Sequence, residues 1–177
     1  AGFTFFTTFF GVYLRNNFNF SSAKIGDYFA IVGLFIAISQ AVVVAKVAKK
    51  LADWKVLRFS MFGLGAMMLV YFVIPTTSSY FLYLVIPFFT LFNGLTMANM
   101  SSLISRSAEM GQQGQAMGIY SSVSSLAQVP ASILVGYITS DITSSQPLFV
   151  SSACIILGGA VFFVLFKPKY VMENAHA

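Results

Sequence analysis

The sequence predicts an all-α, polytopic membrane protein in which six transmembrane helices form one bundle over residues 1–170, with a polar tail at 171–177. Three observations predict this fold. The chain is more apolar than a soluble domain, it contains uncharged runs of membrane-spanning length, and its basic residues collect between those runs.

The composition is that of a chain whose solvent is lipid. Of 177 residues, 58% are hydrophobic and only 8% are charged, whereas soluble domains carry about 25% charged residues. The net charge of +5 lies in connecting segments and not on one helical face. We therefore interpret it as a topology signal and expect no nucleic-acid partner. Cys154 is the single cysteine, so these residues supply no disulfide framework or thiolate metal site.

A basic segment at 46–58 anchors the assignment of the spans. It holds five of the ten lysine and arginine residues of the chain. The run Tyr28–Ala45 before it and the run Phe59–Ile74 after it carry no charge. A short basic segment between two such runs indicates a cytoplasmic turn between two transmembrane helices.

Counting outward from this turn gives six spans. The first, at about 1–14, is too short to cross a bilayer, so we expect residue 1 to be a fragment boundary inside a helix. Asp27 is expected to cap or begin the second span, and Pro87 and Pro130 lie inside the fourth and fifth. After the first, the spans are predicted at 27–45, 59–75, 80–104, 115–139 and 147–166.

The distribution of basic residues predicts the orientation. With alternating sides, only Arg15 and Lys24 fall outside. The eight that fall inside agree with the positive-inside rule; they are Lys46, Lys49, Lys50, Lys55, Arg58, Arg106, Lys167 and Lys169.

The spans differ in polarity, and the difference indicates their surroundings. The third and sixth carry few polar side chains and are predicted to face lipid. The second, fourth and fifth carry amides and hydroxyls that are costly in hydrocarbon, so we expect them to line a watery cavity. Hydroxyl groups also join helices, and both alternatives stay open for the serines. The predicted cavity residues are Gln40, Thr90, Asn93, Met97, Ser121, Ser124 and Gln128.

The residues offer no enzyme site. The sequence contains no glycine-rich phosphate loop, no histidine–cysteine cluster and no serine–histidine–aspartate set, so we expect no enzyme activity, no cofactor and no metal. The only histidine, His176, lies in the polar tail. A proton relay needs a carboxylate or histidine at depth in the membrane, and none of the predicted spans carries one there.

Several stretches resemble the second half of a major facilitator superfamily transporter, in particular the drug/proton antiporters of the tetracycline-efflux type. Leu51-Ala52-Asp53, followed by Lys55 and Arg58, resembles the loop motif G-x-L-A-D-R-x-G-R-R. Lys49 stands at the expected glycine and Trp54 at the expected arginine, so this match is partial.

Two further stretches extend the resemblance to nearly the whole chain. The segment 113–118, leading to Gln128-Val129-Pro130 and Gly136, resembles the entry into the eleventh helix of that family. The segment 25–33 resembles the start of the eighth helix. The resemblance thus assigns the chain to helices seven to twelve of a twelve-helix protein.

This resemblance implies a function. In that family two six-helix halves enclose a midplane cavity and rock to expose it alternately to each side. It implies efflux of small amphiphilic molecules coupled to an ion gradient, with protons, a missing N-terminal half and the lipid bilayer as partners, in a bacterial inner membrane. We expect a gating role for Lys49, Lys50, Asp53, Lys55 and Arg58, with Asp53 paired to a nearby basic residue. The alternative is a complete six-helix channel, scaffold or receptor.

Overall fold

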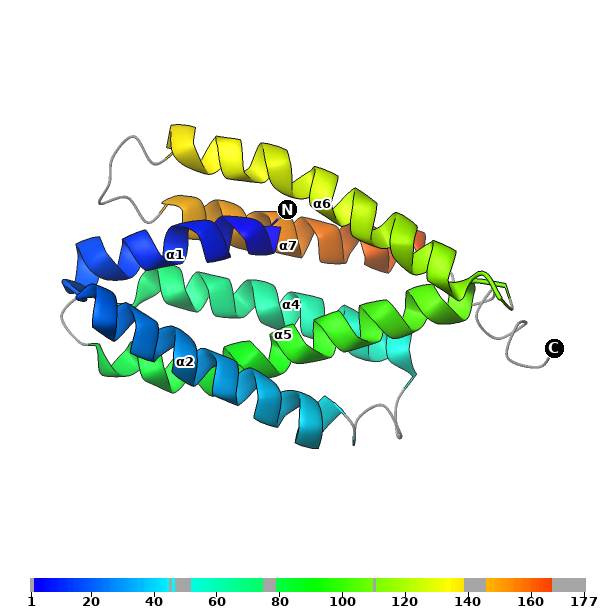
Figure 1. The fold of residues 1–177 in the computed structure, drawn as a ribbon, viewed down its shortest axis with the longest axis horizontal. Coiled ribbons are helices and arrows are strands. Elements are labelled where there is room, and N and C mark those ends of the chain that lie inside the picture. The colour runs from blue at the N-terminus through cyan, green and yellow to red at the C-terminus, as the bar shows by residue number, and fades with distance from the viewer. Residues whose placement is uncertain are drawn as a thin grey trace.

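The computed structural model is an all-helical bundle, as the sequence predicts, and it describes residues 2–44, 46, 52–74, 79–109, 111–138 and 146–166. The predicted inner residues Lys49, Lys50, Lys167 and Lys169 and the tail 171–177 lie outside these ranges. Figure 1 shows the elements, which are α1 (Gly2–Phe18), α2 (Ser22–Ile38), the π-helix η1 (Ser39–Val44), α4 (Asp53–Val73), α5 (Tyr80–Ser107), α6 (Gln113–Ile138) and α7 (Gln146–Leu165).

Four stretches are long and apolar enough to cross a membrane, namely Ser22–Val42, Asp53–Val73, Tyr80–Ser107 and Leu148–Leu165. The chain is therefore an integral, multi-pass membrane protein. The other two long helices differ from these four, because α1 has only 17 residues and α6 interrupts its apolar residues with serines and Gln128. The count of six spans stays a prediction.

The connection between α1 and α2 is shorter than the sequence predicts. α1 continues to Phe18 instead of ending near Leu14, and it stops where Asn19 adopts a left-handed backbone with φ of 53°. Ser21 caps α2, because its hydroxyl oxygen accepts a hydrogen bond from the Lys24 backbone N–H at 3.3 Å. The prediction that Asp27 caps this helix is wrong, since Asp27 lies within α2 and is exposed.

α4 begins at Asp53, six residues before the predicted start of the third span. Asp53 lies in the first turn, where a carboxylate is favourable beside the free backbone N–H groups. Lys55 and Arg58 therefore lie in the first turns of this helix and not in a loop. From Asp53 onward, the predicted loop motif is thus helical.

An aromatic cluster joins the predicted outer ends of α1, α2, α4 and α5. The side chains of Phe10, Tyr13, Tyr28 and Tyr71 are each no more than 1% exposed. The Tyr13 hydroxyl donates to the Tyr71 carbonyl at 3.1 Å, and the Tyr28 and Tyr71 hydroxyls are 2.9 Å apart. Since the buried hydroxyl groups have partners, the cluster adds directional contacts to its apolar packing.

α4 lies between α5 and α7 and packs against both. Ser60 on α4 is fully buried and accepts a hydrogen bond from the Thr96 hydroxyl of α5 at 3.0 Å. The Ser152 hydroxyl of α7 donates to the Gly65 carbonyl of α4 at 2.8 Å. Exposed apolar residues such as Phe59 and Val73 form another face of α4. The third span, predicted to face lipid, therefore exposes only part of its surface, and Ser60 lies on the part that packs against α5.

The predicted orientation can be tested with single cysteines at four exposed or partly exposed positions. Cysteines that replace Ser22 and Ser79 should react with an impermeant thiol reagent added outside intact cells, because these residues lie at the predicted outer ends. Cysteines that replace Ala52 and Gln112 should react only after the cells are opened. Labelling of the cysteine at position 52 in intact cells would contradict the orientation.

Candidate functional site

The polar residues of α5 lie mainly on its buried face. Thr90, Asn93, Thr96 and Asn99 are each at most 8% exposed. Thr90 donates to the Pro87 carbonyl at 3.1 Å, and Asn99 donates to the Leu95 carbonyl at 2.7 Å. Met97, which the sequence also predicts in the cavity, is 41% exposed. The predicted cavity residues of α5 are thus divided between a buried and an exposed face of one helix.

Asn93 differs from the other buried polar residues of α5. Its Oδ1 atom is buried and has no hydrogen-bond partner among the described residues. An unsatisfied buried acceptor costs about 1–3 kcal/mol. Among these four residues, Asn93 is therefore the one with a buried side-chain oxygen that has no described hydrogen-bond partner.

Ser39 shares this property. Its hydroxyl oxygen is also buried without a described partner. Ser39 begins η1, which packs against α5, the helix that carries Asn93.

Ser39 is not among the cavity residues that the sequence predicts. A serine in an apolar run carries no distinguishing pattern, and the feature that marks this one is the π-helix that begins at Ser39. Such irregular helical turns are frequent at functional sites. Gln40, which the sequence predicts in the cavity, lies in this π-helix and is exposed.

The predicted cavity residues of α6 are not buried in the bundle. Ser121 and Gln128 are exposed and Ser124 is half-buried. The Gln128 amide donates to the Ser124 carbonyl at 3.1 Å, one turn earlier. Figure 1 shows α2 and α6 at opposite edges of the bundle. The buried pair Thr90 and Asn93 and the exposed residues of α2 and α6 therefore do not line one enclosed space within the described part of the chain.

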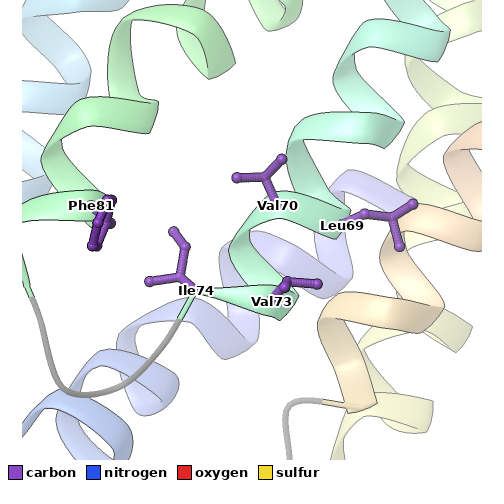
Figure 2. Close-up of a pocket in the computed structure, with 5 residues that line it drawn as sticks. All are labelled: Leu69, Val70, Val73, Ile74 and Phe81. Carbon is purple, nitrogen blue, oxygen red and sulfur yellow. The ribbon is translucent and has the colours of Figure 1, made fainter.

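An apolar pocket of about 420 Å³ lies between the outer ends of α4 and α5 (Figure 2). It is lined by Leu69, Val70, Val73, Ile74 and Phe81. None of these side chains can donate or accept a hydrogen bond, so the pocket offers nothing that would orient a polar substrate.

A second pocket of about 610 Å³, here called the inner pocket, lies at the opposite ends of four helices. Its lining comes from α4, α5, α6 and α7 and is almost entirely apolar; it consists of Leu57, Met61, Met100, Leu103, Ile104, Ser107, Ala108, Ala116, Ile119, Gly158, Phe162 and Phe166. Neither pocket is lined by any of the seven predicted cavity residues.

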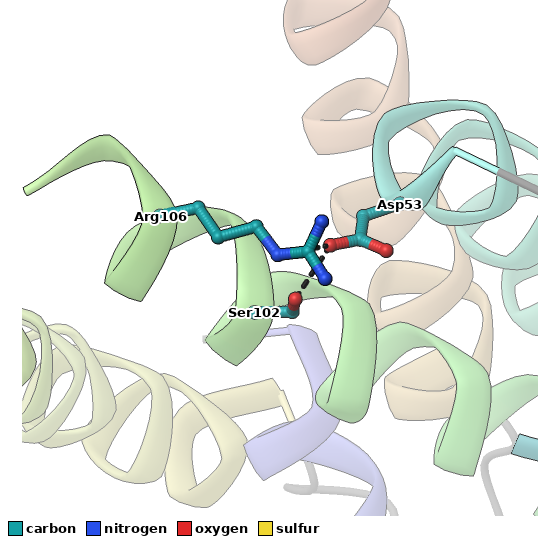
Figure 3. A network of polar contacts seen from close by, with 3 residues as sticks. All are labelled: Asp53, Ser102 and Arg106. Carbon is teal, nitrogen blue, oxygen red and sulfur yellow. Dashed lines mark hydrogen bonds and ion pairs between the residues drawn. The ribbon is translucent and has the colours of Figure 1, made fainter. Parts of the chain in front are cut away.

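Asp53 forms a polar cluster with two residues of α5 at the predicted cytoplasmic end (Figure 3). Its Oδ2 atom accepts a hydrogen bond from the Ser102 hydroxyl at 2.5 Å and lies 3.4 Å from the Arg106 Nε atom. The Asp53 side chain is 7% exposed, whereas Arg106 is 66% exposed. Burial and the charge-assisted hydrogen bond make the Ser102 contact the stronger of the two. The cluster joins the start of α4 to the end of α5.

Arg58 has a different role from Asp53, although the sequence places both in one motif. Its Nη2 atom donates to the carbonyls of Phe163 and Phe166 at 3.1 and 3.0 Å. Its guanidinium lies 4.9 Å from the ring centroid of Trp54 and 4.5 Å from that of Phe163. Arg58 thereby satisfies carbonyls at the C-terminal end of α7, where a positive charge is favourable. Lys55 is exposed and lies over the Trp54 ring at 5.3 Å.

Comparison with known proteins adds a family and two relatives. The family model described as the Major Facilitator Superfamily matches residues 1–176. Hippocampus abundant transcript-like protein 1 of Rattus norvegicus is 27% identical over 191 aligned residues, and its counterpart in Mus musculus is 28% identical. Each alignment covers 91% of this chain but 35% of the relative, so the chain spans about a third of the length of these curated relatives. No solved structure matches.

Proposed function

Because this chain belongs to the major facilitator superfamily, we propose that it is the C-terminal six-helix half of a secondary transporter that moves small amphiphilic molecules by alternating access. Members of this family are transporters and not enzymes. Transport is proposed to be export coupled to an ion gradient, with a second half of the protein facing α2 and α6.

The observation that carries this proposal is the exposure of polar residues on α2, η1 and α6. Gln40, Ser121 and Gln128 are exposed on helices at opposite edges of the bundle. In the most apolar stretch of Ser22–Val42 only 11% of the residues are buried, whereas 44% are buried in the corresponding stretch of Tyr80–Ser107. Exposed amides are costly in hydrocarbon, so these faces are expected to meet a watery cavity or another part of the protein.

The proposed substrate cavity lies between this exposed surface and the proposed second half. Gln40, Met97, Ser121 and Gln128 are exposed and available to it. Asn93, with its unpartnered Oδ1 atom, and Ser39 would add hydrogen-bonding capacity. A cavity with few hydrogen-bonding side chains among many aromatic and aliphatic groups favours an amphiphilic substrate over a highly polar one.

Proton-coupled efflux of the tetracycline-exporter type remains part of this proposal and rests on the motif resemblance at 51–58. No predicted span of this chain carries a carboxylate or histidine at mid-depth, so a proton-carrying group would belong to another part of the protein. Location in a bacterial cytoplasmic membrane is likewise proposed from the resemblance, while the two relatives named above are rodent proteins.

A transport assay on the full-length protein tests the proposal. Vesicles that contain the protein should move a panel of amphiphilic cations and neutral drugs against a gradient when a proton gradient is imposed. Collapse of the proton gradient should stop this movement. Movement that proceeds equally without any ion gradient, and only down the substrate gradient, would contradict secondary active transport.

Substitution of Asn93 and Gln128 separates cavity residues from packing residues. If both contact substrate, Asn93→Ala and Gln128→Ala should alter apparent affinity or substrate range with little change in thermal stability. If the two side chains only form hydrogen bonds within the protein, each substitution should lower stability by about 0.6 kcal/mol, the average for a hydrogen bond in a membrane protein. Transport kinetics and thermal unfolding of each variant give the two readouts.

Cys154→Ala is the matched control for this experiment, because Cys154 is exposed on α7. It should change neither readout. Ser60→Ala is unsuitable as a control, since the Ser60 hydroxyl is buried and bonded to Thr96. Normal transport of every substrate by Asn93→Ala, together with a clear loss of stability, would assign Asn93 to packing.

A further inference from the structure

We infer that the inner pocket binds an acyl chain of an anionic phospholipid from the cytoplasmic leaflet, with the negatively charged headgroup held at Arg58. Lipid binding at this site does not depend on the proposed substrate or on the direction of transport.

The inner pocket has the form of an apolar slot between helix ends. Each helix contributes residues at helical spacing, such as Leu57 and Met61 on α4 and Gly158, Phe162 and Phe166 on α7. Gly158 leaves room in the wall, since a Cβ atom there would meet only the Met61 Cε atom, at 3.7 Å. The slot is about 610 Å³ in volume, and Ser107 is its one lining residue with a polar side chain.

A cation, Arg58, lies beside one end of the pocket, although it is not itself a lining residue. Leu57 and Phe166 line the pocket, and Arg58 follows Leu57 in the chain and donates to the Phe166 carbonyl. Both described hydrogen-bond acceptors of the guanidinium are neutral carbonyls, its other described contacts are aromatic rings, and no carboxylate within salt-bridge distance is described for it. Its Nε atom is buried with no described hydrogen-bond partner. The partial negative charge of the α7 terminus offsets only part of a full positive charge, so the site favours an anion.

A phospholipid matches both features of this site. An acyl chain can enter an apolar slot at little cost, because the surrounding bilayer is equally apolar and there is no hydrophobic driving force either way. The headgroup must therefore supply the selectivity. A phosphate without a balancing amine would meet Arg58, with the exposed Lys55 three residues earlier on α4.

Fluorescence quenching by brominated lipids tests this inference in the full-length protein. In a Trp54→Phe parent, Phe162→Trp places a tryptophan in the lining of the inner pocket, and Val161→Trp places one at the same depth on the exposed face of α7. Each signal is taken as the difference from the parent. The protein is reconstituted with phosphatidylcholine or phosphatidylglycerol that carries bromine on the acyl chain.

We expect the tryptophan at position 162 to show about fivefold higher apparent association with brominated phosphatidylglycerol than with brominated phosphatidylcholine, the preference given by one basic residue near the headgroup. The tryptophan at position 161 should be quenched equally by both lipids. Arg58→Gln should abolish the preference at position 162, and Lys55→Gln should leave most of it. Gly158→Leu, which fills the slot, should reduce quenching at position 162 by both lipids, whereas Leu157→Phe on the exposed face should not.

Three results would overturn the inference. They are an equal lipid preference at positions 161 and 162, a preference that survives Arg58→Gln, and quenching at position 162 that Gly158→Leu leaves unchanged. Because Arg58→Gln also removes hydrogen bonds to α7, the Gly158→Leu variant provides a test that does not alter Arg58.

Discussion

Replacement of Gly65 by alanine is expected to destabilise the protein by about 1–3 kcal/mol, the usual cost of overpacking a well-packed core. A Cβ atom at Gly65 would lie 2.5 Å from the Ile156 Cγ1 atom of α7, which is closer than a normal contact. The Gly65 carbonyl also accepts the Ser152 hydroxyl at 2.8 Å. Movement of α7 to relieve the clash would therefore strain a buried hydrogen bond.

The expected change in stability is opposite in sign to the usual effect of replacing a helical glycine by alanine. Alanine normally stabilises a helix interior by about 0.5–1 kcal/mol relative to glycine. Gly33→Ala is the matched control, because no atom lies within 4 Å of a Cβ atom at Gly33, and it should keep or raise the thermal unfolding temperature. Ile156→Ala should restore part of the stability lost in Gly65→Ala, as measured by a double-mutant cycle. An increase in stability for Gly65→Ala alone would contradict the proposed close contact of α4 and α7.

Substitution of Asp53 by asparagine is expected to slow transport about tenfold while the protein still folds. Asparagine keeps the size of the side chain and can still accept from Ser102, but it removes the charge opposite Arg106. We expect the cluster to stabilise one conformation at the cytoplasmic face relative to the others. A loss of about 1.4 kcal/mol of this free-energy difference corresponds to a tenfold change in rate. Substrate flux and thermal unfolding of the purified variant measure the two effects separately.

Two further variants define the role of the Asp53 cluster. Glu109→Gln is the control, since Glu109 is an exposed acid whose described partner is Gln112, three residues along the chain, and it should leave transport unchanged. Arg106→Gln should change stability little, because Arg106 is 66% exposed, but it should slow transport if the ion pair matters. Unchanged transport in both Asp53→Asn and Arg106→Gln would reduce the cluster to a structural contact between α4 and α5.

The sequence by itself determined the fold class and the family. A backbone in lipid must satisfy its own hydrogen bonds, so a long uncharged run can only be a helix, and its length alone reveals this. The motif around Asp53 and the stretch 106–136 pointed to the major facilitator superfamily, which the match over residues 1–176 confirms. These features are local, since each depends on residues close together in the chain.

The tertiary structure decided which side chains meet. Asp53 pairs with Ser102 and Arg106, Arg58 caps the end of α7 more than a hundred residues away, and Ser60 faces α5 and not lipid. In a soluble helix the apolar stripe identifies the buried face. In a membrane, lipid and protein interior are equally apolar, so α4 and α7 carry no such stripe and their orientation follows only from the neighbours against which they pack.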